Sequence, residues 1–374
     1  MTENKSSIVF KEANESDFVD ISLFHGMKKS NLWHDEYCTW LKDKTVLAVA
    51  RKDNKIIGTQ AFIPYYININ GQAILSGRSE RTLLSPEYRG KLNFVNLMEF
   101  AVDCAKKRGI NVFWGSTSAY KPFKNTNFNI LSGYRCYFAS AINLKSILIQ
   151  FKYALKNKLL HPKSIINAIS KRDRSKIIEY GKTIIVVFSS IYLFIKDLFI
   201  KVKIGNSKYK ILNEPIKYED ISILFENIRE NKNLIHLEQS EEFIKWILGN
   251  NNKIIKLFYY YNEHLLAYIY IDITKKSTAS IMDFASEDKK SFNTLLYVAR
   301  KILNKLGYSF IFVATNIINP HQKKLSIYFL LNGFIPFYKG GSWVIRYDFD
   351  NEYSKYLENI SNWYITDLWL LLNN

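Results

Sequence analysis

Apolar and polar positions along the chain predict helices and strands in an order that occurs twice. Residues 94–115, FVNLMEFAVDCAKKRGINVFWG, carry apolar side chains at helical spacing, lose that pattern at Gly109 and continue as an apolar strand. Residues 292–313, FNTLLYVARKILNKLGYSFIFV, show the same succession around Gly307. The two segments therefore predict the same helix–turn–strand unit in each half of the chain.

Two further pairs of segments follow the same order. A strand, a tight polar turn and a second strand are predicted over residues 45–66 and again over 254–273. Downstream, LSGYRCY at 131–137 corresponds to LNGFIPF at 331–337. We interpret the set as a duplicated unit: a helix, antiparallel strands, then strand–turn–helix–strand–helix–strand. The alternative is two unrelated α/β domains that share only generic patterning.

The predicted fold class is α/β, of the α+β kind, with two tandem domains. Each domain is expected to form a mixed, mostly antiparallel sheet flanked by helices. The 374 residues are long enough for two such domains. We place the first domain at 1–144, a basic helical connector at 145–205 and the second domain at 206–374. We also expect the two domains to close one site between them.

The connector differs in composition from both halves. Residues 145–203 hold 13 lysines and arginines against three acidic residues. The uncharged run from Ile184 to Ile195 has 12 residues, whereas a helix that spans a bilayer needs about 20. Two interpretations stay open. The segment is either a helical connector packed across both domains, or a basic amphipathic segment in peripheral contact with an acidic membrane.

Charge and cysteine content narrow the classes of partner. The formal charge of +18 favours an anionic partner, such as nucleic acid, an acidic membrane or a phosphorylated small molecule. Cys38, Cys104 and Cys136 are scattered, so they predict neither a disulfide framework nor a metal site. The polar N-terminal stretch lacks a signal-peptide core, and we therefore expect a cytoplasmic protein, with membrane association through the connector as the open alternative.

The stretch SPEYRGKLN joins a predicted strand to a predicted helix. A helix N-terminus leaves backbone N–H groups unpaired and carries partial positive charge. Gly90 lets an anion approach the backbone, and Arg89 and Lys91 add full charges. The loop therefore predicts a phosphate or pyrophosphate seat. It matches neither the GxxxxGK[ST] nor the GxGxxG pattern of nucleotide-binding loops.

This strand–loop–helix arrangement resembles the acyl-CoA loop of the GNAT superfamily of N-acyltransferases. The resemblance implies that the strand end pairs with the pantetheine arm of CoA and that the loop amides hold its pyrophosphate. The residues implied for pantetheine are Leu83, Leu84 and Ser85. The residues implied for the pyrophosphate are Tyr88, Arg89, Gly90, Lys91, Leu92 and Asn93. The family's loop usually ends R-G-x-G or R-G-x-A, and Leu92 stands here in place of the second small residue.

The resemblance extends to most of residues 8–140 and 210–370. In the second half the corresponding loop has no glycine, and its lysines follow Glu287 and Asp288. We therefore expect one working acyl-CoA site and one degenerate copy. The C-terminal NWYITDLW also resembles a WxxTxxDxD stretch of large GNAT-like proteins found with bacterial surface-polysaccharide genes, with Trp369 in place of the second acid.

Transfer of an acyl group from a thioester to an amine needs an acceptor for the amine proton and a proton for the thiolate. Glu80, in the strand before the loop, is one candidate base; its structural alternative is a pair with Arg78 or Arg81. Asp283, in the corresponding strand of the second half, is the other candidate, with a capping or turn role as its alternative. By resemblance Tyr120 is the candidate acid, against a buried structural tyrosine.

The sequence thus predicts an N-acyltransferase that uses acyl-CoA and no metal. The acyl group, acetyl or a longer one such as 3-hydroxybutyryl, would pass by direct attack to the amino group of a nucleotide-linked amino sugar in surface glycan biosynthesis. The resemblance implies an acceptor such as a dTDP-3-amino-3,6-dideoxyhexose. One alternative is an aminoacyl-tRNA-dependent transferase of peptide bridges. Another is an inactive basic scaffold on a membrane or nucleic acid, although no nucleic-acid-binding signature favours nucleic acid as a partner.

Overall fold

The structure, a computed structural model, describes seven stretches of the chain. They are residues 7–26, 40–90, 92–142, 209–228, 234–248, 253–348 and 353–369. The connector expected at 145–205 lies outside the described residues. Among the residues that are described, no helix has the length and hydrophobicity that a bilayer span requires.

The first half forms a mostly antiparallel sheet, in which β4 and β5 pair in parallel, with helices on both faces. Its elements are β1 (Val9–Glu12), η1 (Glu15–Asp17), α1 (Phe18–Phe24), β2 (Val46–Lys52), β3 (Lys55–Ile69), β4 (Gln72–Leu84), η2 (Pro86–Tyr88), α3 (Asn93–Lys106), β5 (Val112–Thr117), η3 (Lys121–Asn125) and β6 (Asn129–Ala141).

The second half repeats much of this order. Its elements are β7 (Tyr209–Leu212), α7 (Glu219–Asn227), β8 (Ile235–Leu237), α8 (Glu241–Leu248), β9 (Ile254–Tyr261), β10 (His264–Asp272), β11 (Thr278–Ser286), α9 (Lys289–Lys305), β12 (Phe310–Asn316), α10 (Pro320–Leu331), β13 (Ile335–Tyr347), α11 (Ser354–Leu357) and η4 (Ile360–Asn362).

Local chemistry explains why the two halves share their turns. α3 and α9 are each followed by a glycine with positive φ, 84° at Gly109 and 82° at Gly307, a conformation that ends a helix without a Cβ penalty. The hairpin turns after β2 and β9 likewise place both central residues at positive φ. One difference contradicts the predicted unit. The first half has only the 3-10 turn η3 where a helix corresponding to α10 was expected, because the connection from β5 to β6 is shorter than the connection from β12 to β13.

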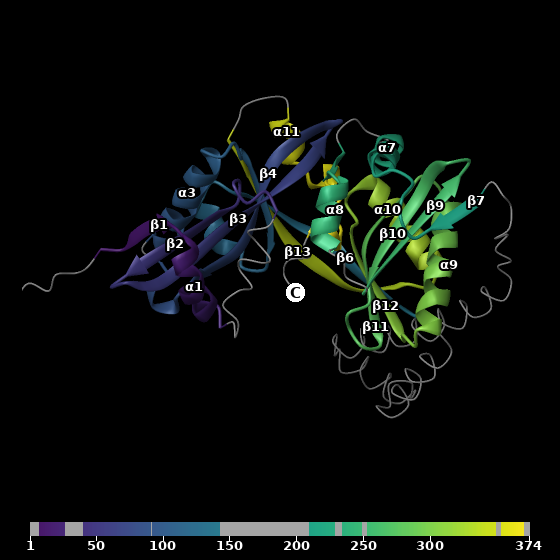
Figure 1. The fold of residues 1–374 in the computed structure, drawn as a ribbon, viewed down its shortest axis with the longest axis horizontal. Helices are drawn as coiled ribbons and strands as arrows, with labels where there is room; N and C mark the ends of the chain where they lie inside the picture. The colour runs from purple at the N-terminus through teal and green to yellow at the C-terminus, as the bar shows by residue number, and fades with distance from the viewer. Residues whose placement is uncertain are drawn as a thin grey trace, which may run out of the picture.

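All strands that the structure describes belong to one sheet, in the order β1-β2-β3-β4-β5-β13-β6-β12-β11-β10-β9-β7, with β8 paired to β3. β13 pairs with β5, and β6 pairs with β12, so each half sends its last strand into the sheet of the other. Figure 1 shows the result: a purple-to-blue lobe and a green lobe joined by β6 and β13. The predicted two-unit α/β fold is confirmed, and the exchange of strands is the feature that joins its units.

The two faces of the first-half sheet carry different helices. Phe62 on β3 packs in one apolar cluster with Leu97 of α3, whereas Ile63 packs in the other with Ile21 of α1. Neighbouring residues of a strand point to opposite faces, so α3 and α1 cover opposite sides of the sheet. We name these sides the α3 face and the α1 face.

Candidate functional site

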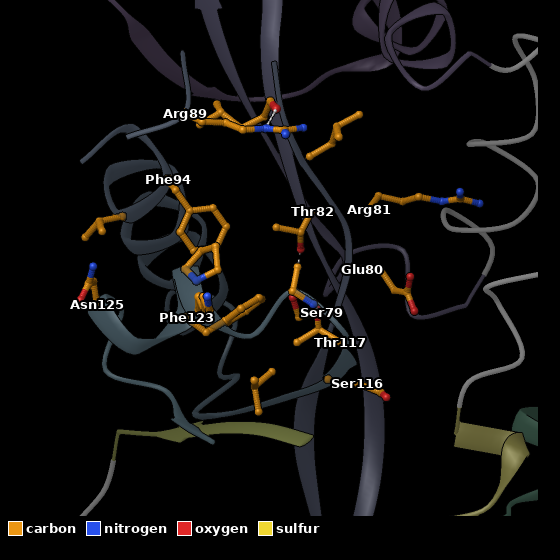
Figure 2. Close-up of a pocket in the computed structure, with 18 of the residues that line it drawn as sticks. Ser79, Glu80, Arg81, Thr82, Arg89, Phe94, Ser116, Thr117, Phe123 and Asn125 are labelled. Atoms are coloured by element: carbon orange, nitrogen blue, oxygen red, sulfur yellow. Dashed lines mark hydrogen bonds between the residues drawn. The ribbon is translucent and has the colours of Figure 1, made fainter. Parts of the chain in front are cut away.

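The parallel strands β4 and β5 separate along their length. They pair over three residues, and the last pair joins Arg78 to Trp114. Both strands continue beyond this pair, and the gap between them is a cavity of about 1010 Å³ (Figure 2). At its narrow end Gly115 permits a close approach, since a Cβ there would lie 3.3 Å from the Cβ of Ser79. The pair of strands is therefore closed at one end and open at the other.

The cavity reaches both faces of the sheet. On the α3 face its wall contains Phe94 and Phe123, whose rings meet edge to face at 5.4 Å. On the α1 face its lining includes Glu80, Arg81 and Ser116, which point away from the two phenylalanines in Figure 2. A long molecule lying between the strands would have an apolar wall on one side and polar groups on the other.

A bulge in β4 shapes the polar wall. The pairing of β4 with β3 shifts register here, and Arg81 adopts a φ of 48°. Gln60 holds the irregular segment at two points: its side-chain amide donates to Ser79 Oγ at 3.0 Å and accepts from Thr82 Oγ1 at 2.6 Å. The bulge is therefore fixed by side chains before any ligand binds.

The loop before α3 forms the wide end of the cavity. Gly90 has a φ of 88° and Leu92 a φ of 62°, and no side chain of the described residues caps α3. Arg89 donates from Nε to the carbonyl oxygen of Leu84 at 3.1 Å, which anchors its guanidinium beside the end of β4. An uncapped helix start with a fixed cation beside it is a suitable environment for an anion.

The structure brings some of the predicted loop residues to this cavity. Those that line it are Leu83, Leu84, Arg89, Gly90 and Leu92. The side chain of Leu92 is 65% exposed, so it lies largely in solvent at the rim.

The other predicted loop residues have different places. Ser85 is not part of the lining, and its N–H donates to Ile57 O at 2.8 Å. Asn93 and Tyr88 bond to each other, from the Asn93 side-chain amide to the Tyr88 carbonyl at 2.9 Å, outside the lining. Lys91 lies outside the described residues.

Glu80 lies on the α1 face and forms a buried ion pair with Arg78, which in turn donates to the hydroxyl of Tyr65 at 3.2 Å. The predicted structural alternative for Glu80, a pair with Arg78, is therefore present. The same carboxylate also lines the cavity, so the pairing and a role toward a ligand are compatible in space.

His25, at the end of α1, completes the α1 side of the cavity. Its Nε2 is 2.9 Å from Thr59 Oγ1. Burial, and then the charge of Arg81, lower the pKa of His25 to about 4, so the imidazole is neutral at pH 7. Sequence patterns gave no indication of His25, Ser79, Thr82 or Ser116 as site residues. These residues line the cavity only because β4 and β5 separate in the folded chain.

Tyr120, the predicted acid, lies at the start of η3. It is half-buried, and Lys124 Nζ is 5.9 Å from its ring centroid. Its neighbours Ala119 and Lys121 line the cavity, whereas Tyr120 is not among the lining residues.

Asp283 occupies the corresponding position of the second half. It lies two residues beyond the last β11–β12 pair, Ile281–Val313, as Glu80 lies two beyond Arg78–Trp114. Its carboxylate accepts from Gln239 Nε2 at 2.7 Å and from Tyr268 OH at 2.8 Å, and burial raises its pKa to about 6. Asp283 is buried in the second half and does not line the cavity.

The N-terminus of α9 is capped by a side chain of the described residues, whereas the N-terminus of α3 is not. Asp288 caps α9, and its carboxylate accepts from the N–H groups of Lys290 at 2.7 Å and Ser291 at 2.9 Å. An acidic side chain therefore occupies the position that an anion would need. This gives a physical basis for the degenerate second loop expected from the sequence.

The gap between β11 and β12 is filled by the chain itself. Tyr364 donates from its hydroxyl to Phe284 O at 2.7 Å. On the β12 side, the side-chain amide of Asn316 donates to Trp363 O at 2.8 Å, so the C-terminal segment bonds to both strands. The aromatic residues of NWYITDLW, Trp363, Tyr364 and Trp369, are buried, so they belong to the core and not to a ligand-stacking surface.

The second half still contributes to the open cavity. Val344, on the exchanged strand β13, is among the lining residues. The described residues bring together no group of three or more histidine, cysteine, aspartate or glutamate side chains that could hold a metal ion.

Comparisons with solved structures identify the fold. A GCN5-related N-acetyltransferase from Anabaena variabilis superposes with a TM-score of 0.55 at 10% identity, over 95% of this chain and 74% of that one. A probable N-acyltransferase from Enterococcus faecalis superposes with a TM-score of 0.54 at 9% identity, over 91% and 73%. The N-myristoyltransferase of Saccharomyces cerevisiae, solved with bound myristoyl-CoA, superposes with a TM-score of 0.50 at 12% identity, over 91% and 79%.

These likenesses show that the chain has the fold of GCN5-related N-acetyltransferases. At such low identity they show the fold alone. Scans of the sequence against protein-family models and against curated proteins find no match.

Proposed function

We propose that the chain is an acyl-CoA-dependent N-acyltransferase with one donor site, in the cavity between β4 and β5. The observation that carries the proposal is the continuity of this cavity from the uncapped start of α3 to the narrow end at Ser79. Along β4 that path is roughly 17 Å long, for about five residues at 3.4 Å each. A pyrophosphate at the helix start and an extended arm between the strands would follow this path.

The fold is consistent with the proposed function, but the proposal depends on the residues of the cavity. The yeast neighbour was solved with bound myristoyl-CoA, and the other neighbours are described as N-acetyltransferases or as a probable N-acyltransferase. In this chain the support comes from the residues at the cavity: Arg89 and Gly90 at the wide end, and the apolar wall of Phe94 and Phe123.

The acceptor amine would approach from the α1 face and attack the thioester directly. Glu80 is the carboxylate on that side of the cavity and is proposed to take the amine proton. A covalent serine intermediate has little support, because Ser79 bonds to Gln60 and Ser116 lies near Tyr134. The acyl group is proposed to be acetyl or a longer one such as 3-hydroxybutyryl.

The proposed acceptor is a nucleotide-linked amino sugar, for example a dTDP-3-amino-3,6-dideoxyhexose, used in surface glycan biosynthesis. The net charge of +18 suits an acceptor that brings a second pyrophosphate.

Calorimetric titration with acetyl-CoA tests the donor site. We expect the native chain to bind one equivalent and Arg89→Ala to bind roughly tenfold more weakly, a loss of about 1.4 kcal/mol. Lys289→Ala, at an exposed cation in the first turn of α9, is the matched control and should bind as the native chain does. If neither acetyl-CoA nor longer acyl-CoAs bind, the proposed function is wrong.

Release of free CoA thiol tests the acceptor. The dTDP-linked 3-amino sugar should promote release, and the same nucleotide sugar with a hydroxyl in place of the amine should not. If the chain binds acyl-CoA but transfers the acyl group to no nucleotide-linked amino sugar, the proposed acceptor is wrong. The proposed acyl-CoA site would not be affected by that result.

A further inference from the structure

A pair of hydroxyl groups on the α1 face has no role in the function proposed above. Ser116 on β5 lies two residues beyond Trp114, as Glu80 on β4 lies two beyond Arg78, so the two side chains flank the narrow end of the cavity on one face (Figure 2). Tyr134 on β6 lies behind Ser116, with its hydroxyl oxygen 3.3 Å from Ser116 Oγ. Tyr134 is fully buried, whereas Ser116 lines the cavity.

The surroundings of Tyr134 fix where its ring lies. The ring meets Trp343 edge to face at 5.9 Å. Gly341, with a φ of 91°, leaves room for it, since a Cβ there would lie 3.2 Å from a ring carbon. Both Trp343 and Gly341 belong to the exchanged strand β13. The strand exchange therefore holds the tyrosine in place.

The direction of the hydrogen bond follows from burial. Within the described part of the chain, Ser116 Oγ is the hydrogen-bond partner of the Tyr134 hydroxyl. Either hydroxyl could donate across this contact. A buried hydroxyl hydrogen without an acceptor is costly, so the arrangement that satisfies the buried group has Tyr134 donating to Ser116. Burial also raises the pKa of Tyr134, which keeps this proton in place at neutral and mildly alkaline pH. Ser116 then has its own hydrogen free to point into the cavity.

We infer that Ser116 donates a hydrogen bond to the thioester sulfur and that Tyr134 is the positioning residue that directs it. The inference rests on the proposed function and deepens it. As the amine nitrogen bonds to the carbonyl carbon, the carbon–sulfur bond breaks and its electron pair moves to sulfur. Ser116 stabilises that developing charge without losing its proton. The amine proton passes to Glu80, which returns it to solvent, and the released thiolate takes a proton from solvent, so the step needs no net proton.

The second half supplies a matched control. Thr315 lies two residues beyond Val313 on β12, the position that corresponds to Ser116, and it is fully buried. The gap beside it is filled by the chain's own C-terminal segment, so Thr315→Val should leave turnover unchanged.

The experiment measures CoA release from acetyl-CoA with hydroxylamine, an acceptor that needs no binding pocket. We expect kcat to fall about 100-fold in Ser116→Ala and about 10-fold in Tyr134→Phe, with acetyl-CoA affinity unchanged. The double variant should be no slower than Ser116→Ala, because Tyr134 acts through Ser116. Ser116→Thr keeps the hydroxyl and should recover most of the rate.

Several outcomes would overturn the inference. Losses that multiply in the double variant would show that Tyr134 acts separately from Ser116. Equal rates for Ser116→Ala and Ser116→Thr would show that the hydroxyl is not used, and this comparison decides even if Tyr134→Phe fails to fold. A native chain that binds acetyl-CoA but releases no CoA also contradicts the inference. Failure to bind acetyl-CoA contradicts instead the proposed function.

Discussion

The two halves of this molecule share a strand order and differ at the start of one helix. Leu92 is the N-cap residue of α3, no side chain of the described residues caps that helix, and Arg89 lies beside it. The N-cap residue of α9 is Asp288, whose carboxylate bonds to two backbone N–H groups. The unpaired N–H groups of a helix start attract an anion only while they remain available. The capping aspartate is therefore one difference that separates the candidate anion site at α3 from the closed copy at α9.

The gaps between the parallel strands show the same contrast. In the first half the gap is a cavity of about 1010 Å³, and in the second half the segment with Trp363 and Tyr364 bonds to both strands. The carboxylates at corresponding positions also differ. Glu80 is paired with Arg78, whereas the hydrogen bonds of Asp283 come from the neutral groups of Gln239 and Tyr268. The same strand order thus supports an open polar site in one half and a packed core in the other.

The largest expected effect comes from breaking the ion pair of the open half. Glu80→Gln leaves the nearly inaccessible Arg78 charged without its carboxylate, so we expect the free energy of unfolding to fall by roughly 3 kcal/mol. Urea denaturation at pH 7 measures this loss. The double variant Arg78→Met, Glu80→Leu removes both charges and should recover most of it. A loss below about 1 kcal/mol for Glu80→Gln would mean that the pair contributes little to folding.

Asp283, in the second half, should make the free energy of unfolding depend on pH in the opposite sense from a carboxylate that is paired with a cation. Because burial raises the pKa of folded Asp283 from 3.8 to about 6, its stabilising effect is complete below pH 4 and is lost as pH rises through 6. We expect this loss to reach about 2–3 kcal/mol of unfolding free energy by pH 7.5.

Asp283→Asn, which cannot ionise, should remove that pH dependence. Urea denaturation of both proteins at pH 4.5 and pH 7.5 measures it, and parallel curves would contradict the raised pKa. Acetyl-CoA affinity should stay within twofold of native in this variant. Slower transfer in it would favour the sequence-based prediction that Asp283 acts in catalysis.

Adding a carboxylate at the start of α3 and removing the one at the start of α9 tests the comparison directly. Leu92→Asp places a carboxylate at the start of α3, where α9 carries Asp288, and it should weaken acetyl-CoA binding at least tenfold by repelling the pyrophosphate. The reverse change, Asp288→Ala, should cost about 1 kcal/mol of stability through the lost cap and leave acetyl-CoA affinity unchanged. Titration calorimetry and urea denaturation measure the two effects. Undiminished affinity in Leu92→Asp would show that the anion does not bind at this helix.

The smallest effect is expected for Leu92→Gly. Leucine at a φ of 62° carries backbone strain of about 1 kcal/mol, and glycine relieves it while adding conformational freedom to the unfolded chain. We expect unfolding free energy to change by less than about 1 kcal/mol. Because the Leu92 side chain is largely exposed, acetyl-CoA affinity should change less than threefold. A larger gain in affinity would show that Leu92 obstructs the pyrophosphate.

Local sequence patterns specify the helices and strands and their repetition. Helical spacing in α3 and α9, the glycines that end them and the polar hairpin turns depend on residues close together in the chain, and they predicted the duplicated α/β fold. The loop around Arg89 and Gly90 was identified for the same reason, since its chemistry lies within a few residues. The acids before α9 likewise indicated which half would be closed.

Long-range packing sets how the halves join and which residues share a site. The exchange of β6 and β13 depends on pairing between strands far apart in sequence, which no local pattern specifies. The same is true of Ser116 beside Tyr134, and of Tyr364 beside Phe284 of β11. Hydrophobic periodicity shows which face of a helix or strand is buried, but not which distant element packs against that face. The point at which two parallel strands separate depends on this packing between distant elements.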